Sequence, residues 1–171
     1  MRVTDLLALS HVPRWSIVPR MHEQSVADHT FRVLVIALEL VERLKLADAP
    51  TIRCLNGMDF FLAILYHDAD ESRTGDIPTP VKERAGVSDP IASCPWLATS
   101  DTYAYLPTSL KVVLSLADKI EALTFISRYG VGPHSVRASD NMIRKVREAC
   151  PTEWNTVVYK LIGDITNDMG R

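Results

Sequence analysis

A histidine and an aspartate stand side by side at residues 67 and 68, where an apolar segment ends. In the middle of a helix, adjacent side chains point about 100° apart. At a helix end, an imidazole and a neighbouring carboxylate can both turn toward one ion. Such a pair supplies only part of a coordination shell, so further ligands must come from other parts of the chain. The pair therefore indicates a candidate site for a divalent metal ion.

Two further candidate ligands interrupt apolar segments. His29 lies on the otherwise apolar face of residues 26–46, and Asp118 interrupts the strongly apolar residues 110–126. An isolated buried carboxylate is costly unless it has a charged partner or a metal ion. Histidine and carboxylate ligands together suit Mn²⁺, Co²⁺, Zn²⁺ or Fe²⁺. Each residue also has an ordinary alternative, because a lone helical histidine is often hydrogen-bonded or exposed, and Asp118 beside Lys119 could be a surface residue.

The segments that carry these residues have helical periodicity. Apolar residues recur at steps of three and four, as one face of a helix requires. Ser25 is a suitable first cap, Thr108 a suitable cap for a later helix, and Gly130 a residue that could end that helix in a left-handed conformation. The predicted helices cover residues 26–46, 58–66, 108–129, 135–149 and 151–165. We therefore expect an all-α fold in which residues 1–171 form a single domain.

Composition excludes several classes of protein. The net charge of −2 is too acidic for a protein that wraps nucleic acid. No apolar run has the length of a membrane span, and Asp5 interrupts the start where a signal peptide would be apolar. The cysteines are odd in number and form no CxxC pair, which argues against a disulfide framework. We expect a cytoplasmic protein with neither a nucleic-acid nor a membrane partner.

The order His29, His67-Asp68, Asp118 in a helical chain resembles the HD superfamily of metal-dependent phosphohydrolases. More narrowly, Arg14-Trp15 and the segment TGDIPTPVK at residues 74–82 are similar to the bacterial 5′-deoxynucleotidases. They are equally similar to the compact phage dATP triphosphohydrolases, which remove dATP where the genome uses 2-aminoadenine. The resemblance covers residues 10–130, and it implies an HD-type helical bundle.

The resemblance implies that His29, His67, Asp68 and Asp118 hold the metal ion, with Co²⁺, Mn²⁺ or Zn²⁺ as candidates. A second divalent ion that accompanies a triphosphate is left as an open alternative. Glu71, four residues after His67, would act as an acid or base without binding the ion. The ordinary alternative for Glu71 is a solvated carboxylate at a helix end.

The resemblance also implies a substrate site for a small deoxynucleotide. Arg14 and Lys82 would bind phosphate oxygens. Asp76 would accept a hydrogen bond from the sugar 3′-hydroxyl, and Trp15 would lie against the deoxyribose and leave no room for a 2′-hydroxyl. Ordinary surface charge is the alternative for the two cations, and a core position is the alternative for the tryptophan.

Ile17 and Pro80 are expected at the edge of the base. In an extended segment, a residue two positions after Trp15 points the same way, so Ile17 could reach the base. It would give adenine an apolar neighbour and leave the extra amine of guanine or 2-aminoadenine unpaired, which costs a few kcal/mol. The resulting hypothesis is selectivity for adenine.

These residues predict a dATP triphosphohydrolase that releases deoxyadenosine and triphosphate, with dADP and dAMP as further substrates, and that depletes dATP for a phage in the host cytoplasm. The cations Arg20, Arg73 and Arg84 favour a triphosphate. One alternative is a 5′-deoxynucleotidase acting on monophosphates, and others are a non-catalytic nucleotide sensor and a helical interaction module. Members of the family form dimers or larger rings, so we expect a homo-oligomer, either a dimer or a hexamer.

Overall fold

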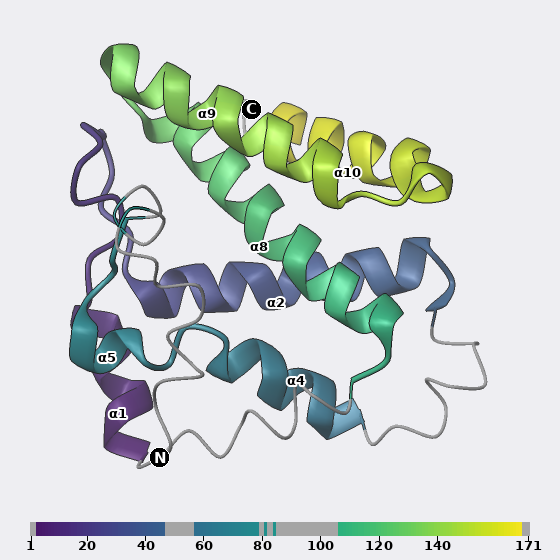
Figure 1. The fold of residues 1–171 in the computed structure, drawn as a ribbon, viewed down its shortest axis with the longest axis horizontal. Coiled ribbons are helices and arrows are strands. Elements are labelled where there is room, and N and C mark those ends of the chain that lie inside the picture. The colour runs from purple at the N-terminus through teal and green to yellow at the C-terminus, as the bar shows by residue number, and fades with distance from the viewer. Residues whose placement is uncertain (1–2, 47–56, 79–80, 82–83, 85–105, 169–171) are drawn as a thin grey trace.

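The fold is built around one long central helix, α8, against which α2, α9 and α10 pack (Figure 1). This computed structural model describes residues 3–46, 57–78, 81, 84 and 106–168. Every regular element in those ranges is a helix, and two antiparallel bridges, Pro13 with Ser25 and Arg20 with Gly130, are isolated. The prediction of an all-α fold is confirmed. The named elements are α1 Val3–Ala8, η1 Leu9–His11, α2 Val26–Arg43, α4 Gly57–Tyr66, α5 Glu71–Thr74, α8 Thr108–Tyr129, α9 Gly132–Ala149, η4 Thr152–Trp154 and α10 Asn155–Asp168.

Helix α8 lies between α2 on one side and the α9–α10 layer on the other (Figure 1). Its apolar residues are buried around most of its circumference, and Val113, Leu116 and Ile120 are fully buried. They pack against Val33 and Leu40 of α2, with Ile64, Val146 and Val158 completing the same core. Side chains on α8 therefore project from a rigid support. None of the described helices combines the length and apolarity needed to cross a membrane.

Helix α2 begins where the sequence indicates. The Ser25 hydroxyl accepts from the backbone N–H of Asp28 at 3.1 Å, and the Asp28 carboxylate accepts in return from the Ser25 N–H at 3.1 Å. This reciprocal cap satisfies two N–H groups that a first turn leaves open. The helix ends at Arg43 rather than residue 46, because Lys45 adopts a positive φ of 54°.

The ends of α8 differ from the prediction. Thr108 is the first helical residue, Pro107 precedes it as the cap, and no side chain caps the helix. Gly130 has φ −71°, which is not the left-handed conformation. A Cβ at residue 130 would lie 2.4 Å from Ser135 Cβ and 2.6 Å from the Ile126 carbonyl oxygen. Glycine is needed there for the close approach of α8 and α9, not for its backbone freedom.

The last two helices also begin at other residues than predicted. Helix α9 starts at Gly132, three residues early, with Pro133 in its first turn, where the missing N–H is not needed. After Pro151 the chain forms only the short η4, and α10 begins at Asn155. Helices α8 and α9 therefore form a long antiparallel pair with a very short connection (Figure 1).

Candidate active site

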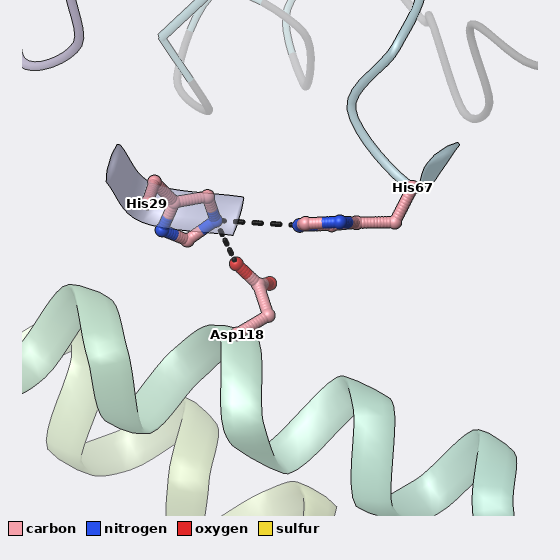
Figure 2. Close-up of side chains that lie close together, drawn as sticks. All are labelled: His29, His67 and Asp118. Atoms are coloured by element: carbon pink, nitrogen blue, oxygen red, sulfur yellow. Dashed lines mark hydrogen bonds and ion pairs between the residues drawn. The ribbon is translucent and has the colours of Figure 1, made fainter. Parts of the chain in front are cut away.

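His29 of α2, Asp118 of α8 and His67, in the turn that follows α4, lie together (Figure 2). The Nε2 atom of His29 lies 3.3 Å from Nε2 of His67 and 3.2 Å from Oδ1 of Asp118. Asp68 completes the group, since its Oδ2 lies 3.5 Å from the same His29 nitrogen and 3.4 Å from the His67 nitrogen. The four residues predicted as metal ligands thus meet at one point of the fold, although they are separated by up to 89 positions in the chain.

The Nδ1 atoms of both histidines, which point away from this group, already form hydrogen bonds. Nδ1 of His29 lies 2.6 Å from Oε2 of Glu121, and Nδ1 of His67 lies 2.6 Å from the Ile64 carbonyl oxygen. Both partners are acceptors, so both Nδ1 atoms carry hydrogen, and each ring in its neutral, metal-binding form would turn the lone pair of Nε2 inward. A metal ion would take the place of the second proton of His29, and the two lone pairs would then lie beside two carboxylates. A cation at the centre would satisfy all of these acceptors, so the residues present fit a divalent metal ion.

The charged groups around the His29–His67–Asp118 group shift one another's pKa values. Burial and the charge of Arg14 lower the pKa of His29, but hydrogen bonds to Asp118 and Glu121 outweigh them and raise it to about 9. Burial raises the pKa of Asp118, but the hydrogen bond to His29 and the nearby positive charges hold it below its ordinary value. The pKa of Asp68 is likewise lowered, against burial, by the charges of His67, Arg14 and His29. Both carboxylates therefore remain ionised and able to bind a cation.

A chain of buried hydrogen bonds connects His29 to Trp15, and we call these four residues the buried relay: Trp15, Gln24, Glu121 and His29. The Trp15 indole N–H donates to Oε1 of Gln24 at 2.9 Å. The Gln24 amide donates to Oε1 of Glu121 at 2.8 Å, and the other Glu121 oxygen accepts from His29. Gln24 and Glu121 are only 2% and 1% exposed, so water does not compete for these bonds.

Trp15 sits in an unusual backbone conformation. Its φ is 62°, a left-handed value that is uncommon for a large side chain. Its N–H donates to Oδ2 of Asp76 at 3.1 Å, and its carbonyl accepts from Arg20 at 2.8 Å. The indole ring stacks on Phe125 of α8, with the ring centroids 6.2 Å apart and 9° between the planes. Arg20 of the same loop and two residues distant in sequence, Asp76 and Phe125, thus fix this tryptophan.

Five of the predicted residues border one cavity of about 470 Å³: Arg14, Trp15, Ile17, Asp76 and Asp118. Arg14 also reaches Asp68, with 2.9 Å between Nη1 and Oδ2. Glu71 is the first residue of α5 and is 3% exposed, so the alternative of a solvated carboxylate is wrong. Pro80 and Lys82 lie outside the described residues.

The opposite wall of the cavity was not predicted. It is formed by α9 and the adjacent turn of α8, with the polar residues His134, Arg137, Asn141, Lys145 and Lys119. The α9 residues recur at steps of three and four, so they share one helix face. That spacing was visible in the sequence, but a polar helix face is usually one that faces solvent.

The cations expected to favour a triphosphate do not line this cavity. Arg20 donates to backbone carbonyls of its own loop and pairs with Glu23. Arg73 pairs with Asp5 of α1 at 3.2 Å. Both therefore serve the local structure, and that part of the prediction is wrong for Arg20 and Arg73. Arg84 is exposed and is not among the lining residues.

Comparison with known families and proteins identifies several relatives. Residues 3–115 match the family described as 5′-deoxynucleotidase YfbR-like. The dATP triphosphohydrolase of Salmonella phage PMBT28 is 30% identical over 137 residues, which cover 77% of this chain and 69% of that protein. The dATP triphosphohydrolase of cyanophage S-2L is 28% identical over 137 residues, 77% of this chain and 73% of that protein. A 5′-deoxynucleotidase of Erwinia tasmaniensis is 34% identical over 79 residues, 45% of this chain and 37% of that protein.

Two solved structures share the fold. The cyanophage S-2L HD phosphohydrolase DatZ, described as bound to dA and one catalytic Zn²⁺ ion, matches with a TM-score of 0.81 at 21% identity, covering 98% of each chain. The PH0347 protein of Pyrococcus horikoshii OT3 matches with a TM-score of 0.69 at 16% identity, covering 96% of each chain. The predicted HD-type helical bundle is confirmed.

Proposed function

The chain belongs to the YfbR-like family of HD phosphohydrolases, and from this premise we propose that it is a dATP triphosphohydrolase, which converts dATP to deoxyadenosine and triphosphate. The observation that carries this proposal is the convergence of His29, His67, Asp68 and Asp118 beside a cavity large enough for a nucleotide. Phage dATP triphosphohydrolases are similar over three quarters of the chain, which favours this activity and a role in depleting dATP for a phage. We include dADP and dAMP as further substrates.

In this proposal the four converging residues hold one divalent ion, Zn²⁺, Co²⁺ or Mn²⁺. When bound, the ion would polarise a phosphoryl oxygen and make a coordinated water more acidic. The hydrogen bond from His29 to Glu121 and that from His67 to the Ile64 carbonyl would hold each ring with Nε2 toward the ion. A second divalent ion that accompanies the triphosphate is part of the same proposal.

The remaining residues would handle the phosphate and the proton. Arg14 is held by Asp68 at the cavity wall, and its guanidinium would bind oxygens of the reacting phosphate. Lys82 would add a second positive charge. Glu71 follows the His67-Asp68 pair by one turn and would protonate the 5′-oxygen as its bond to phosphorus breaks.

Trp15 and Asp76 would recognise the sugar. The same Asp76 carboxylate that would accept from the 3′-hydroxyl also holds the Trp15 N–H, so the two contacts to the sugar are positioned together. The fixed indole would leave no room for a 2′-hydroxyl. We therefore expect a deoxynucleotide to be turned over much faster than the matching ribonucleotide, which a comparison of dATP with ATP measures.

Ile17 would face the base, with Pro80 beside it. Ile17 lies in a turn after Trp15, not in the predicted extended segment, because the Val18 N–H donates to the Trp15 carbonyl at 3.0 Å. It still lines the cavity and is 58% exposed, so it can contact a ligand. We expect Ile17→Gly to bring the rates on dATP and dGTP closer together by about tenfold, because one unfavourable contact with the guanine amine is removed. Unchanged relative rates would reject a role for Ile17 in base selection. Ile143→Gly, on the exposed side of α9, is the control for loss of a surface isoleucine.

A 5′-deoxynucleotidase acting on monophosphates is the second candidate, and the similarity to the Erwinia enzyme favours it. Steady-state rates for dATP, dADP, dAMP and dGTP, each with Co²⁺, Mn²⁺ and Zn²⁺, separate the two. Release of triphosphate from dATP supports the proposal, and turnover of dAMP alone supports the alternative.

Two tests distinguish the enzyme from a helical interaction module and from a non-catalytic sensor. Metal analysis of the purified protein should find bound metal, and a protein that binds none would fit the interaction module. Glu71→Gln should bind metal and dATP with little change but lose most of the turnover, because the proton donor is gone. A wild-type protein that binds dATP without turnover would be a sensor.

We also propose that residues 1–171 act as one catalytic domain in the cytoplasm and self-associate as a dimer or hexamer. A groove between α1, α2 and α4 supports association with a second copy, because its apolar residues Phe31, Met58, Phe61 and Leu65 are exposed. Light scattering of the protein and of Phe31→Glu tests this. The variant should shift to a smaller species.

A further inference from the structure

The cavity has a positively charged wall that the proposed roles above do not use. Lys119 of α8 and Lys145 of α9 both line it, as does Arg137 nearer the other end of α9. Asp76 and Asp118 are the carboxylates among the lining residues, and Asp118 already belongs to the proposed metal centre. The cavity wall is thus rich in positive charge, although the whole chain carries −2.

The two lysines lie at the metal end of the cavity, away from Ile17. The segment that follows Ile17 is anchored at the α8–α9 connection, because the Val131 N–H donates to the Pro19 carbonyl at 2.9 Å and the Met21 N–H donates to the Tyr129 carbonyl at 2.8 Å. Lys119 is ten residues before Tyr129 and Lys145 is thirteen after Gly132, about 15 Å and about 20 Å along their helices. Lys119 and Lys145 are therefore level with Asp118, whereas Ile17 is near the connection.

Lys119 is held in a defined position. Its ammonium group donates to the Ser115 carbonyl at 3.0 Å and to the Ser115 hydroxyl at 2.8 Å. Those bonds use two of its three N–H donors. An anion between the two lysines would relieve their mutual repulsion.

We propose that Lys119 and Lys145 form a subsite for the phosphate groups beyond the one that reacts. The inference rests on the proposed function and makes it more specific. A nucleotide whose base lies near Ile17 and whose reacting phosphate lies at Asp118 and Arg14 would direct its remaining phosphates along the same cavity, toward these lysines. Inorganic tripolyphosphate has the same chemistry and should occupy the subsite without a nucleoside.

The test compares Lys145→Met with Arg147→Met, which removes the same charge from the outer face of α9. Lys145→Met should raise KM for dATP and the inhibition constant of tripolyphosphate about tenfold, the value of one charge-assisted contact. The inhibition constant of deoxyadenosine should change less than twofold, and that of dAMP little more. Arg147→Met should leave all four constants unchanged. Ser115→Ala, which removes one of the two hydrogen bonds that hold the Lys119 ammonium, should also weaken tripolyphosphate binding more than deoxyadenosine binding.

Other outcomes have separate meanings. Equal losses for deoxyadenosine and tripolyphosphate in Lys145→Met, or no change in either, would overturn the subsite. Equal weakening by Arg147→Met would do the same, because it would show a general effect of charge. A wild-type enzyme that releases no triphosphate from dATP would instead contradict the proposed function, and tripolyphosphate binding to that protein would still measure the subsite directly.

Discussion

Replacing Glu121 with glutamine tests whether the buried relay supports the proposed metal centre. Glu121 accepts from His29 at 2.6 Å and from Gln24 at 2.8 Å, and all three side chains are at most 2% exposed. A glutamine has the same shape but carries one acceptor and one donor in place of two acceptors. One of its two neighbours would then face a donor. The change also removes one of the two carboxylates, Asp118 and Glu121, that raise the pKa of the His29 ring.

Those contacts set the expected loss of metal affinity and of stability in Glu121→Gln. A histidine ligand that loses its hydrogen-bonded partner typically costs 10–100-fold in metal affinity, or about 1.4–2.7 kcal/mol. If the new amide faces His29, the ring proton moves to Nε2 and the nitrogen can no longer bind a cation. The mismatch between buried donors would also lower the free energy of unfolding by about 1–3 kcal/mol.

The assay is a competition for Zn²⁺ between the protein and a chelating dye, with thermal unfolding measured on the same samples with and without metal. Glu148→Gln is the matched control, because this exposed carboxylate pairs only with Arg144 of its own helix among the described residues. Glu121→Gln should lose Zn²⁺ affinity and the stabilisation that Zn²⁺ gives, and the control should lose neither. Zn²⁺ affinity within twofold of wild type in Glu121→Gln would refute the reasoning, even if the variant unfolds at a lower temperature.

Two further predictions concern stability. Gly130→Ala should lower the free energy of unfolding by about 2 kcal/mol, because the new Cβ would meet Ser135 Cβ at 2.4 Å and the fixed Ile126 carbonyl oxygen at 2.6 Å. Urea titration measures this loss. The control is Gly163→Ala, which should be neutral or stabilising, because a Cβ there meets no atom within 4 Å. Ser25→Ala should cost about 1 kcal/mol by the same titration, because α2 loses its cap, and an unchanged midpoint would show that the cap adds no stability.

The convergence of the four candidate metal ligands could be predicted because each of them interrupts or ends an apolar pattern. His29 and Asp118 are polar residues on helix faces that are otherwise buried, and burial demands a partner for them. The same signal is present at Glu121, which interrupts the same apolar helix three residues after Asp118. Glu121 is missed because the resemblance supplies no role for it, although its burial is more complete than that of Asp118.

The cavity wall on α9 could not be predicted in the same way. His134, Arg137, Asn141 and Lys145 form a polar stripe, and in one sequence such a stripe is identical whether it faces solvent or a ligand. The partner of each relay residue depends on tertiary packing, since Gln24 and Glu121 are 97 positions apart. Helix ends were uncertain for a similar reason. The need for glycine at residue 130 comes from its contact with Ser135 of the next helix, which the local sequence does not reveal.

The left-handed backbone of Trp15 has a consequence for the order in which the protein folds. An isolated chain would seldom hold a tryptophan at φ 62°, because that region costs about 1–3 kcal/mol. Asp76, Arg20, Gln24 and Phe125 offset this cost only after α2, α8 and the segment before residue 76 are in place. Trp15 should therefore adopt its native conformation late in folding, and its amide should exchange with deuterium sooner than the amides of α8.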